Sequence, residues 1–261
     1  MKLTVLKLGG ELFEAAVARK HVADMIAALV SSGDRLVVVH GGGKAIDAEL
    51  ARRGIQPRKV DGLRITDADT LDAVIAVLAG SANTSLVAAL VARGVKAVGL
   101  TGVDAGCGRA QSAPPLRATS GEIVDLGLVG DPTEANPALF RTLLGAGYVP
   151  VVACLGVDDA GQVLNVNADV MACRIAAALS AELIIAGTTP GVFDANGGTI
   201  PMLDVEGMDA LIASGAANAG MVAKLNVCRV ALDSGVPAVK IVDGKDLKTG
   251  TTLQQTYVGD K

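Results

Sequence analysis

The feature that most restricts the fold of this chain is a pair of glycine-rich turns, each directly after a short apolar run. The first turn is K-L-G-G at residues 7–10, and the second is H-G-G-G-K at residues 40–44. Apolar side chains recur at helical spacing after each turn, so each turn is expected to join a strand to a helix. Parallel α/β sheets bind ligands at such junctions, because glycine lets backbone amides approach an anion closely.

The same alternation of strands and helices continues along the chain and predicts helices stacked on a mainly parallel sheet. Only 2% of the residues are aromatic, so Ala, Val, Leu and Ile must form the core. No linker rich in proline, glycine or serine separates the halves, and we expect two lobes, residues 1–179 and 180–261, to meet across a cleft. The expected strands are residues 3–8, 36–40, 97–100, 149–154, 182–186 and 238–242, and the expected helices are 17–31, 44–53, 168–179, 205–214 and 221–234. Hairpins and loops are expected between residues 101 and 136.

Charge and composition argue against several classes of protein. A formal net charge of −4 and the lack of Trp disfavour nucleic acid and anionic membranes as partners. Residues 73–92 carry no charge, but G-S-A-N-T-S at residues 80–85 interrupts them, so we expect two helices with a break rather than a membrane span. The four cysteines have no C-x-x-C spacing and predict reduced, mostly buried thiols in a cytoplasmic protein.

Lys7 is unusual because it lies inside an otherwise apolar strand. A buried ammonium group is costly unless a negative group receives it, and a bound phosphate would do so. The alternative is a lysine that extends to solvent from an edge strand. Neither the Walker pattern G-x-x-x-x-G-K-[ST] nor a G-x-G-x-x-G turn in a suitable context is present, which disfavours a P-loop or dinucleotide-binding enzyme.

Three further clusters carry groups suited to phosphoryl transfer. Arg64 has a planar fork that would hold a carboxylate, although a surface ion pair is the alternative. Asp169, in N-V-N-A-D at residues 165–169, precedes a helix that it could simply cap. Lys224 is expected in the first turn of a helix, where a cation opposes the helix dipole and implies a nearby anion. Two lysines, two glycine turns, an arginine and an aspartate together suit a site that neutralises phosphates and positions a carboxylate.

Taken in order, these motifs resemble the acetylglutamate kinase family within the amino acid kinase superfamily. The motifs that carry the resemblance span nearly the whole chain: residues 7–10, 40–43, 61–66 (D-G-L-R-I-T), 99–104 (G-L-T-G-V-D), 125–130 (D-L-G-L-V-G), 165–169 and 220–224 (G-M-V-A-K). The resemblance implies a three-layer αβα sandwich whose first lobe binds N-acetyl-L-glutamate and forms a homodimer, and whose second lobe binds ATP. It also implies that the γ-carboxylate of the amino acid attacks the γ-phosphoryl group to form an acyl phosphate, the second step of arginine biosynthesis.

The resemblance further implies roles for individual residues. Lys7 and Lys224 look like the cations that stabilise the transferring phosphoryl group, and Asp169 looks like the residue that orients both lysines. The other expected contacts are Gly42, Gly43, Arg64 and Asn165 with the substrate, Gly9 and Gly10 with phosphate, and Thr188, Gly191, Val192, Phe193, Ala216 and Asn218 with the nucleotide. Mg²⁺ is expected on phosphates and water, with no protein ligand.

This chain departs from the family at Thr188, where relatives commonly carry an aspartate. It also begins at its first strand, without the N-terminal helical extension that is typical of hexameric, arginine-inhibited members of the family. We therefore expect a dimer without strong arginine feedback, and docking of a PII-type regulator stays open.

One alternative function is a kinase of glutamate or aminoadipate attached to a carrier protein. In such kinases the turn that corresponds to the one around Arg64 typically holds a second basic residue. Another is a sensor of acetylglutamate or arginine without turnover, against which Lys7, Asp169 and Lys224 argue. Uridylate kinases match on length but poorly on the motifs.

Overall fold

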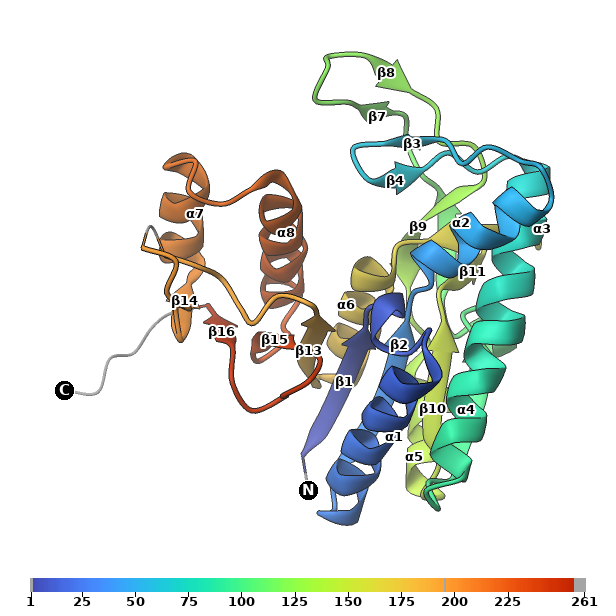
Figure 1. Ribbon diagram of the computed structural model, residues 1–261, viewed down its shortest axis with the longest axis vertical. Coiled ribbons are helices and arrows are strands. Elements are labelled where there is room, and N and C mark those ends of the chain that lie inside the picture. The colour runs from blue at the N-terminus through green and yellow to red at the C-terminus, as the bar shows by residue number, and fades with distance from the viewer. Residues whose placement is uncertain (1, 195, 256–261) are drawn as a thin grey trace.

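The computed structural model describes residues 2–194 and 196–255, and its centre is an eight-stranded sheet (Figure 1). The strand order is β14-β16-β15-β13-β1-β2-β10-β5. Neighbouring strands are parallel except β15 and β16, which confirms a mainly parallel sheet. The strands are β1 (Leu3–Leu8), β2 (Arg35–His40), β5 (Ala97–Thr101), β10 (Val149–Ala153), β13 (Glu182–Gly187), β14 (Met202–Asp204), β15 (Val239–Asp243) and β16 (Thr251–Gln254). Because β1 pairs with both β2 and β13, the sheet continues from residues before position 179 to residues after it.

Helices cover both faces of this sheet and confirm the three-layer arrangement (Figure 1). Successive side chains of a strand point to opposite faces. Leu6 and Leu8 therefore share a core with α1 (Ala16–Ser31) and α4 (Asn83–Val91), whereas Val5 belongs to the core on the other face. That second core includes side chains of α2 (Gly43–Arg52), α5 (Pro137–Gly145), α6 (Ala168–Leu179), α7 (Val205–Ala213) and α8 (Ala219–Asp233).

The strands and helices expected from the sequence are present, with ends that differ by at most two residues. The segment between residues 101 and 136 contains the predicted hairpins and loops. There, β7 (Leu116–Arg117) and β8 (Ile123–Val124) form a hairpin that projects from the sheet beside a second hairpin, β3 (Lys59–Val60) and β4 (Leu63–Arg64) (Figure 1). A small closed sheet is made by β6 (Arg109–Ser112), β9 (Val129–Glu134), β11 (Leu155–Val157) and β12 (Val163–Val166).

The expected break near residue 80 is wrong, because residues 68–91 form one helix. It comprises α3 (Ala68–Ile75), a π-helical segment η2 (Ala76–Ala82) and α4. The π-helical turn accommodates Gly80 and Ser81 without ending the helix. By length and composition alone this helix could cross a membrane, since an 18-residue stretch of it has a mean hydropathy of 2.0. Leu86 and Leu90 nevertheless pack into the core beside α1, so part of this apolar surface belongs to the core of the chain.

The cysteines are free thiols, and all four are buried, as predicted. Burial raises the pKa of Cys107, Cys154 and Cys173 to about 12. These thiols are therefore protonated at neutral pH and pack as small apolar side chains.

Candidate active site at the carboxyl ends of the central strands

The two glycine turns lie side by side at the carboxyl ends of β1 and β2. The Gly9 amide donates to Ala186 O at 3.0 Å, and the Gly41 amide donates to Leu8 O at 3.2 Å. A Cβ on Gly10 would lie 2.8 Å from Gly42 Cα, which is closer than real side chains come to backbone. Only glycine at position 10 therefore lets the two turns contact each other, at a strand-to-helix junction of the kind that binds phosphate.

Lys7 lies in the centre of the sheet, not at an edge, so the edge-strand alternative is wrong. It pairs in register with Val39 on one side and Ile185 on the other. Its ammonium group forms an ion pair with Asp169 Oδ1 at 2.9 Å, and the side chains are only 12% and 21% exposed. A carboxylate thus compensates the largely buried charge before any ligand binds.

Asp169 lies in the first turn of α6, but it does not cap that helix. Asn167 is the N-cap, and its Oδ1 accepts hydrogen bonds from the amides of Asp169 at 2.9 Å and Val170 at 3.3 Å. The alternative in which Asp169 only caps the helix is therefore wrong. The side-chain oxygen of Asn167 caps the helix, which leaves the Asp169 carboxylate free to pair with Lys7.

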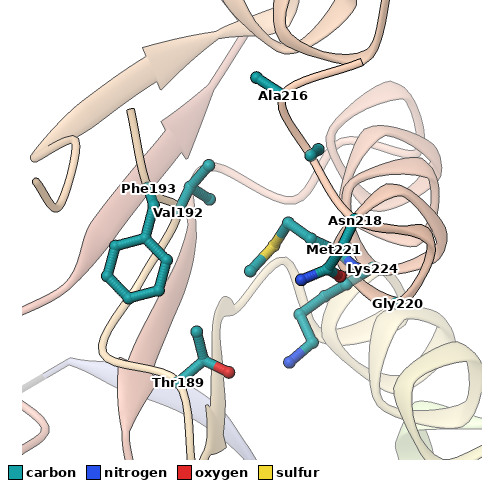
Figure 2. Close-up of a pocket in the computed structure, with 9 residues that line it drawn as sticks. Thr189, Val192, Phe193, Ala216, Asn218, Gly220, Met221 and Lys224 are labelled. Carbon is teal, nitrogen blue, oxygen red and sulfur yellow. Dashed lines mark hydrogen bonds between the residues drawn. The ribbon is translucent and has the colours of Figure 1, made fainter. Parts of the chain in front are cut away.

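Lys224 projects from α8 into a pocket of about 270 Å³ in the C-terminal part of the chain (Figure 2). The helix begins at Ala219, so Lys224 lies in its second turn, and the argument from a cation in the first turn is wrong. Lys224 Nζ is 3.8 Å from the point where a Cβ on Gly187 would lie, at the end of β13. The pocket is lined by Thr189, Val192, Phe193, Ala216, Ala217, Asn218, Gly220, Met221 and Lys224.

The pocket brings together four of the six residues expected to contact the nucleotide: Val192, Phe193, Ala216 and Asn218. Thr188 is exposed and does not line the pocket; its neighbour Thr189 does. Gly191 is buried with φ of 152°, and a Cβ there would lie 2.7 Å from Thr251 Oγ1. That hydroxyl accepts a hydrogen bond from the Val192 amide at 2.8 Å. Gly191 therefore allows the loop to pack closely against Thr251 and does not itself line the pocket.

Lys7, Lys224 and Asp169 all lie close enough to the buried thiol of Cys228 to affect its pKa. Cys228 of α8 is fully buried, and burial raises the pKa of its thiol well above the ordinary value. Asp169 raises this pKa further, whereas the two lysines lower it. Among the residues that the structure describes, Asp169 forms its ion pair with Lys7 and not with Lys224.

Arg64 is a buried residue of β4, so the alternative of a surface ion pair is wrong. Its Nη2 is 2.6 Å from Asp47 Oδ1 and donates to Gly43 O at 3.2 Å. Although burial opposes the shift, hydrogen bonds from Lys59 and Arg64 lower the pKa of Asp47, which keeps this carboxylate ionised. Nη1 of Arg64 is buried and has no hydrogen-bond partner in the described part of the chain. Asp47 and Gly43 O fix the position of Arg64 through Nη2, and Nη1 can bind an anion.

Asn165 lies in β12, on the same side of the site as Arg64. Its Nδ2 donates to Thr66 Oγ1 at 3.1 Å, and Thr66 is fully buried two residues after Arg64. The Thr66 hydroxyl in turn donates to Arg64 O at 3.1 Å, so one hydroxyl links the two residues of the predicted substrate clamp, Arg64 and Asn165.

His40 and Asn83, which support the second glycine turn, are a pair that the sequence did not predict. Asn83 Nδ2 donates to His40 Nε2 at 3.0 Å and to Val151 O at 2.9 Å. His40 is fully buried, and this burial lowers its pKa to about 4. A separation of 43 residues leaves no local signal in the sequence for this contact.

Comparisons with known proteins agree with this geometry. The model of the amino acid kinase family matches residues 2–243. The chain is 45% identical to an acetylglutamate kinase of Solibacter usitatus over 94% of this chain and 91% of that protein, and 43% identical to one of Symbiobacterium thermophilum over 94% and 85%. Among solved structures, smu.665 from Streptococcus mutans has a TM-score of 0.82 at 28% identity, covering 97% of this chain and 99% of that one. Carbamate kinase from Giardia lamblia has a TM-score of 0.68 at 13% identity, covering 98% and 99%, and shares the fold.

Proposed function

Since this chain belongs to the amino acid kinase family, we propose how its site carries out the reaction of an acetylglutamate kinase. The enzyme transfers the γ-phosphoryl group of ATP to the γ-carboxylate of N-acetyl-L-glutamate, a step of arginine biosynthesis. The nucleophile is already an anion and needs no strong general base. The main barrier is the approach of two anions, which fixed positive charge lowers.

Lys7 and Lys224 supply this positive charge from opposite sides of the transferring group. The ion pair with Asp169 at 2.9 Å holds Lys7 in place, so its ammonium need not reorganise during the reaction. Lys224 lines the pocket that we assign to ATP (Figure 2). Amides of Gly10 and of the second glycine turn bind the phosphoryl oxygens between the two lysines. The Gly9 amide takes no part, because it already donates to Ala186 O.

Arg64 binds the α-carboxylate of N-acetyl-L-glutamate. Asp47 and Gly43 O already occupy Nη2, so the unpartnered Nη1 is the group left for the substrate. Gly42, Gly43 and Asn165 complete this end of the site. The γ-carboxylate then points toward the glycine turns, where it meets the γ-phosphoryl group in line.

The single observation that supports this proposal most strongly is the Lys7–Asp169 ion pair in the centre of the sheet, directly behind two contacting glycine turns. The test is Lys224→Ala, with the exposed Lys245→Ala in the same part of the chain as the matched control. Removing one group that stabilises transition-state charge costs roughly 100-fold or more in kcat. We expect that loss for Lys224→Ala, with binding of N-acetyl-L-glutamate by calorimetry nearly unchanged. Full turnover in Lys224→Ala would contradict the proposal.

We also propose that the chain is a homodimer. The most apolar 18-residue stretch of the helix of residues 68–91 has a mean hydropathy of 2.0, yet only 33% of this stretch is buried within one chain. A second copy would cover this surface. Sedimentation equilibrium should give twice the chain mass of 26.2 kDa, and a monomer at micromolar concentration would contradict this assignment. The division at residue 179, the cytoplasmic location, weak arginine feedback and docking of a PII-type protein stay predictions.

A further inference from the structure

Glu11 is a charged residue at the site to which the reaction described above gives no role. It is the central residue of the short helix η1 (Gly10–Leu12), which begins at the first glycine turn. Its side chain folds back over that turn: a Cβ on Gly9 would collide with Glu11 Oε1 and would lie 2.7 Å from Oε2. The carboxylate is therefore held against the backbone that we assign to phosphate.

The same carboxylate lies near Lys224. Glu11 Oε1 is 3.9 Å, and Lys224 Nζ is 3.8 Å, from the point where a Cβ on Gly187 would lie. Glycine leaves this point open between the two groups. Among the described residues, the ion pairs that involve β1, η1 or α8 are Lys7–Asp169 and Arg229–Asp209, so neither Glu11 nor Lys224 is committed to one.

The other carboxylates around this position already have partners or face elsewhere. Asp169 pairs with Lys7, and Asp243, which is in register with Gly187, accepts a hydrogen bond from the Lys245 amide. Glu14 Oε1 lies 3.3 Å from the Cβ position of Gly10, on the side of the second glycine turn. Glu11 is thus the carboxylate that lies between the first glycine turn and the nucleotide pocket.

A carboxylate at this position would repel the phosphates of ATP unless a cation lay between them. Mg²⁺ bound to nucleotides commonly takes one or two protein carboxylates in addition to phosphate oxygens and water. The described residues contain no group of three or more His, Cys, Asp or Glu that could hold a metal ion unaided, so the phosphates must provide most of the ligands. We propose that the Glu11 carboxylate is a protein ligand of the Mg²⁺ that accompanies ATP, an inference that rests on the function proposed above.

Binding of Mg²⁺ by Glu11 and simple repulsion of phosphate by Glu11 predict different effects of the same substitution. If Glu11 binds Mg²⁺, Glu11→Gln weakens nucleotide binding when Mg²⁺ is present. The same substitution strengthens binding when Mg²⁺ is removed, because the repulsion is lost. If Glu11 only repels phosphate, the substitution strengthens binding under both conditions.

The experiment is calorimetric binding of β,γ-imido-ATP to the full chain, in excess Mg²⁺ and in EDTA. It compares wild type, Glu11→Gln and the control Glu206→Gln, which removes an exposed charge on α7. We expect the gain in affinity from Mg²⁺ to fall roughly tenfold or more in Glu11→Gln and to stay unchanged in the control. Titration of Mn²⁺ into the complex with the analogue, followed by electron paramagnetic resonance, should show the same loss of metal affinity.

An undiminished gain from Mg²⁺ in Glu11→Gln, with native circular dichroism, would overturn this inference and leave the proposed function intact. Failure of the wild-type chain to bind the analogue under either condition would overturn both.

Discussion

Lowering the pH should destabilise this protein through one residue, His40. This imidazole ends β2, directly before the second glycine turn, and is fully buried. Its Nδ1 is 3.0 Å from Gly41 O, and its Nε2 is 3.0 Å from Asn83 Nδ2. Because Asn83 Nδ2 also donates to Val151 O, the amide presents N–H groups to the ring. The neutral tautomer with its proton on Nδ1 satisfies both contacts, whereas a second proton on Nε2 would face a donor.

The size of the effect follows from the pKa of His40. Burial lowers this pKa from 6.5 to about 4, so between these values the unfolded chain binds the proton and the folded chain does not. The free energy of unfolding therefore falls as the pH drops through this window. Linkage gives a loss of about 2 kcal/mol between about pH 7.5 and about pH 5 from this residue alone.

Urea unfolding at these two pH values measures the loss. Far-ultraviolet circular dichroism is the suitable probe, because the chain contains no Trp. Carboxylates titrate over part of the same range, so the comparison is between wild type and His40→Gln, whose amide can take part in both hydrogen bonds. We expect the wild type to lose about 2 kcal/mol more than the variant. Equal losses would refute the reasoning, as would a nuclear magnetic resonance titration in which the folded-state imidazole of His40 becomes protonated near pH 6.5.

Two further predictions concern the substrate clamp and the helix that carries Asp169. Arg64→Lys should raise the KM for N-acetyl-L-glutamate roughly tenfold or more in steady-state assays, because one ammonium cannot serve both Asp47 and a substrate carboxylate in the fork geometry; an unchanged KM would exclude Arg64 from the clamp. Asn167→Ala should lower the free energy of unfolding by about 1 kcal/mol in urea, since α6 loses its N-cap. No change in stability would mean that water replaces the cap.

The central part of the fold could be predicted from the sequence because its signals are local. The short aliphatic runs, the helical spacing between them and the glycine turns identify the strand-to-helix junctions. Lys7 stands out for the same reason, as a charge inside an apolar strand. Its partner Asp169 is predicted only through the family resemblance, because the local sequence carries no signal for a contact between β1 and α6.

The errors of the sequence analysis arise where tertiary contacts override local rules. Gly80 lies in a π-helical turn rather than a break, and the surrounding helix packs against the sheet. Lys224 falls in the second turn of α8 because the helix starts at Ala219, capped by Asn218. Glu11 gave no periodic or motif signal, because its position is set by close approach to Gly9 and Gly187.

The measurement that tests the central claim most directly is formation of an acyl phosphate, trapped as a hydroxamate. Purified enzyme with ATP and Mg²⁺ would be offered N-acetyl-L-glutamate, glutamate, aspartate and N-acetylaminoadipate in parallel. Our account predicts hydroxamate from N-acetyl-L-glutamate and little from the three others. If no hydroxamate formed with any of the four acceptors although ATP was bound, the proposed function would be contradicted. The result would instead indicate a carrier-bound substrate or a sensor without turnover.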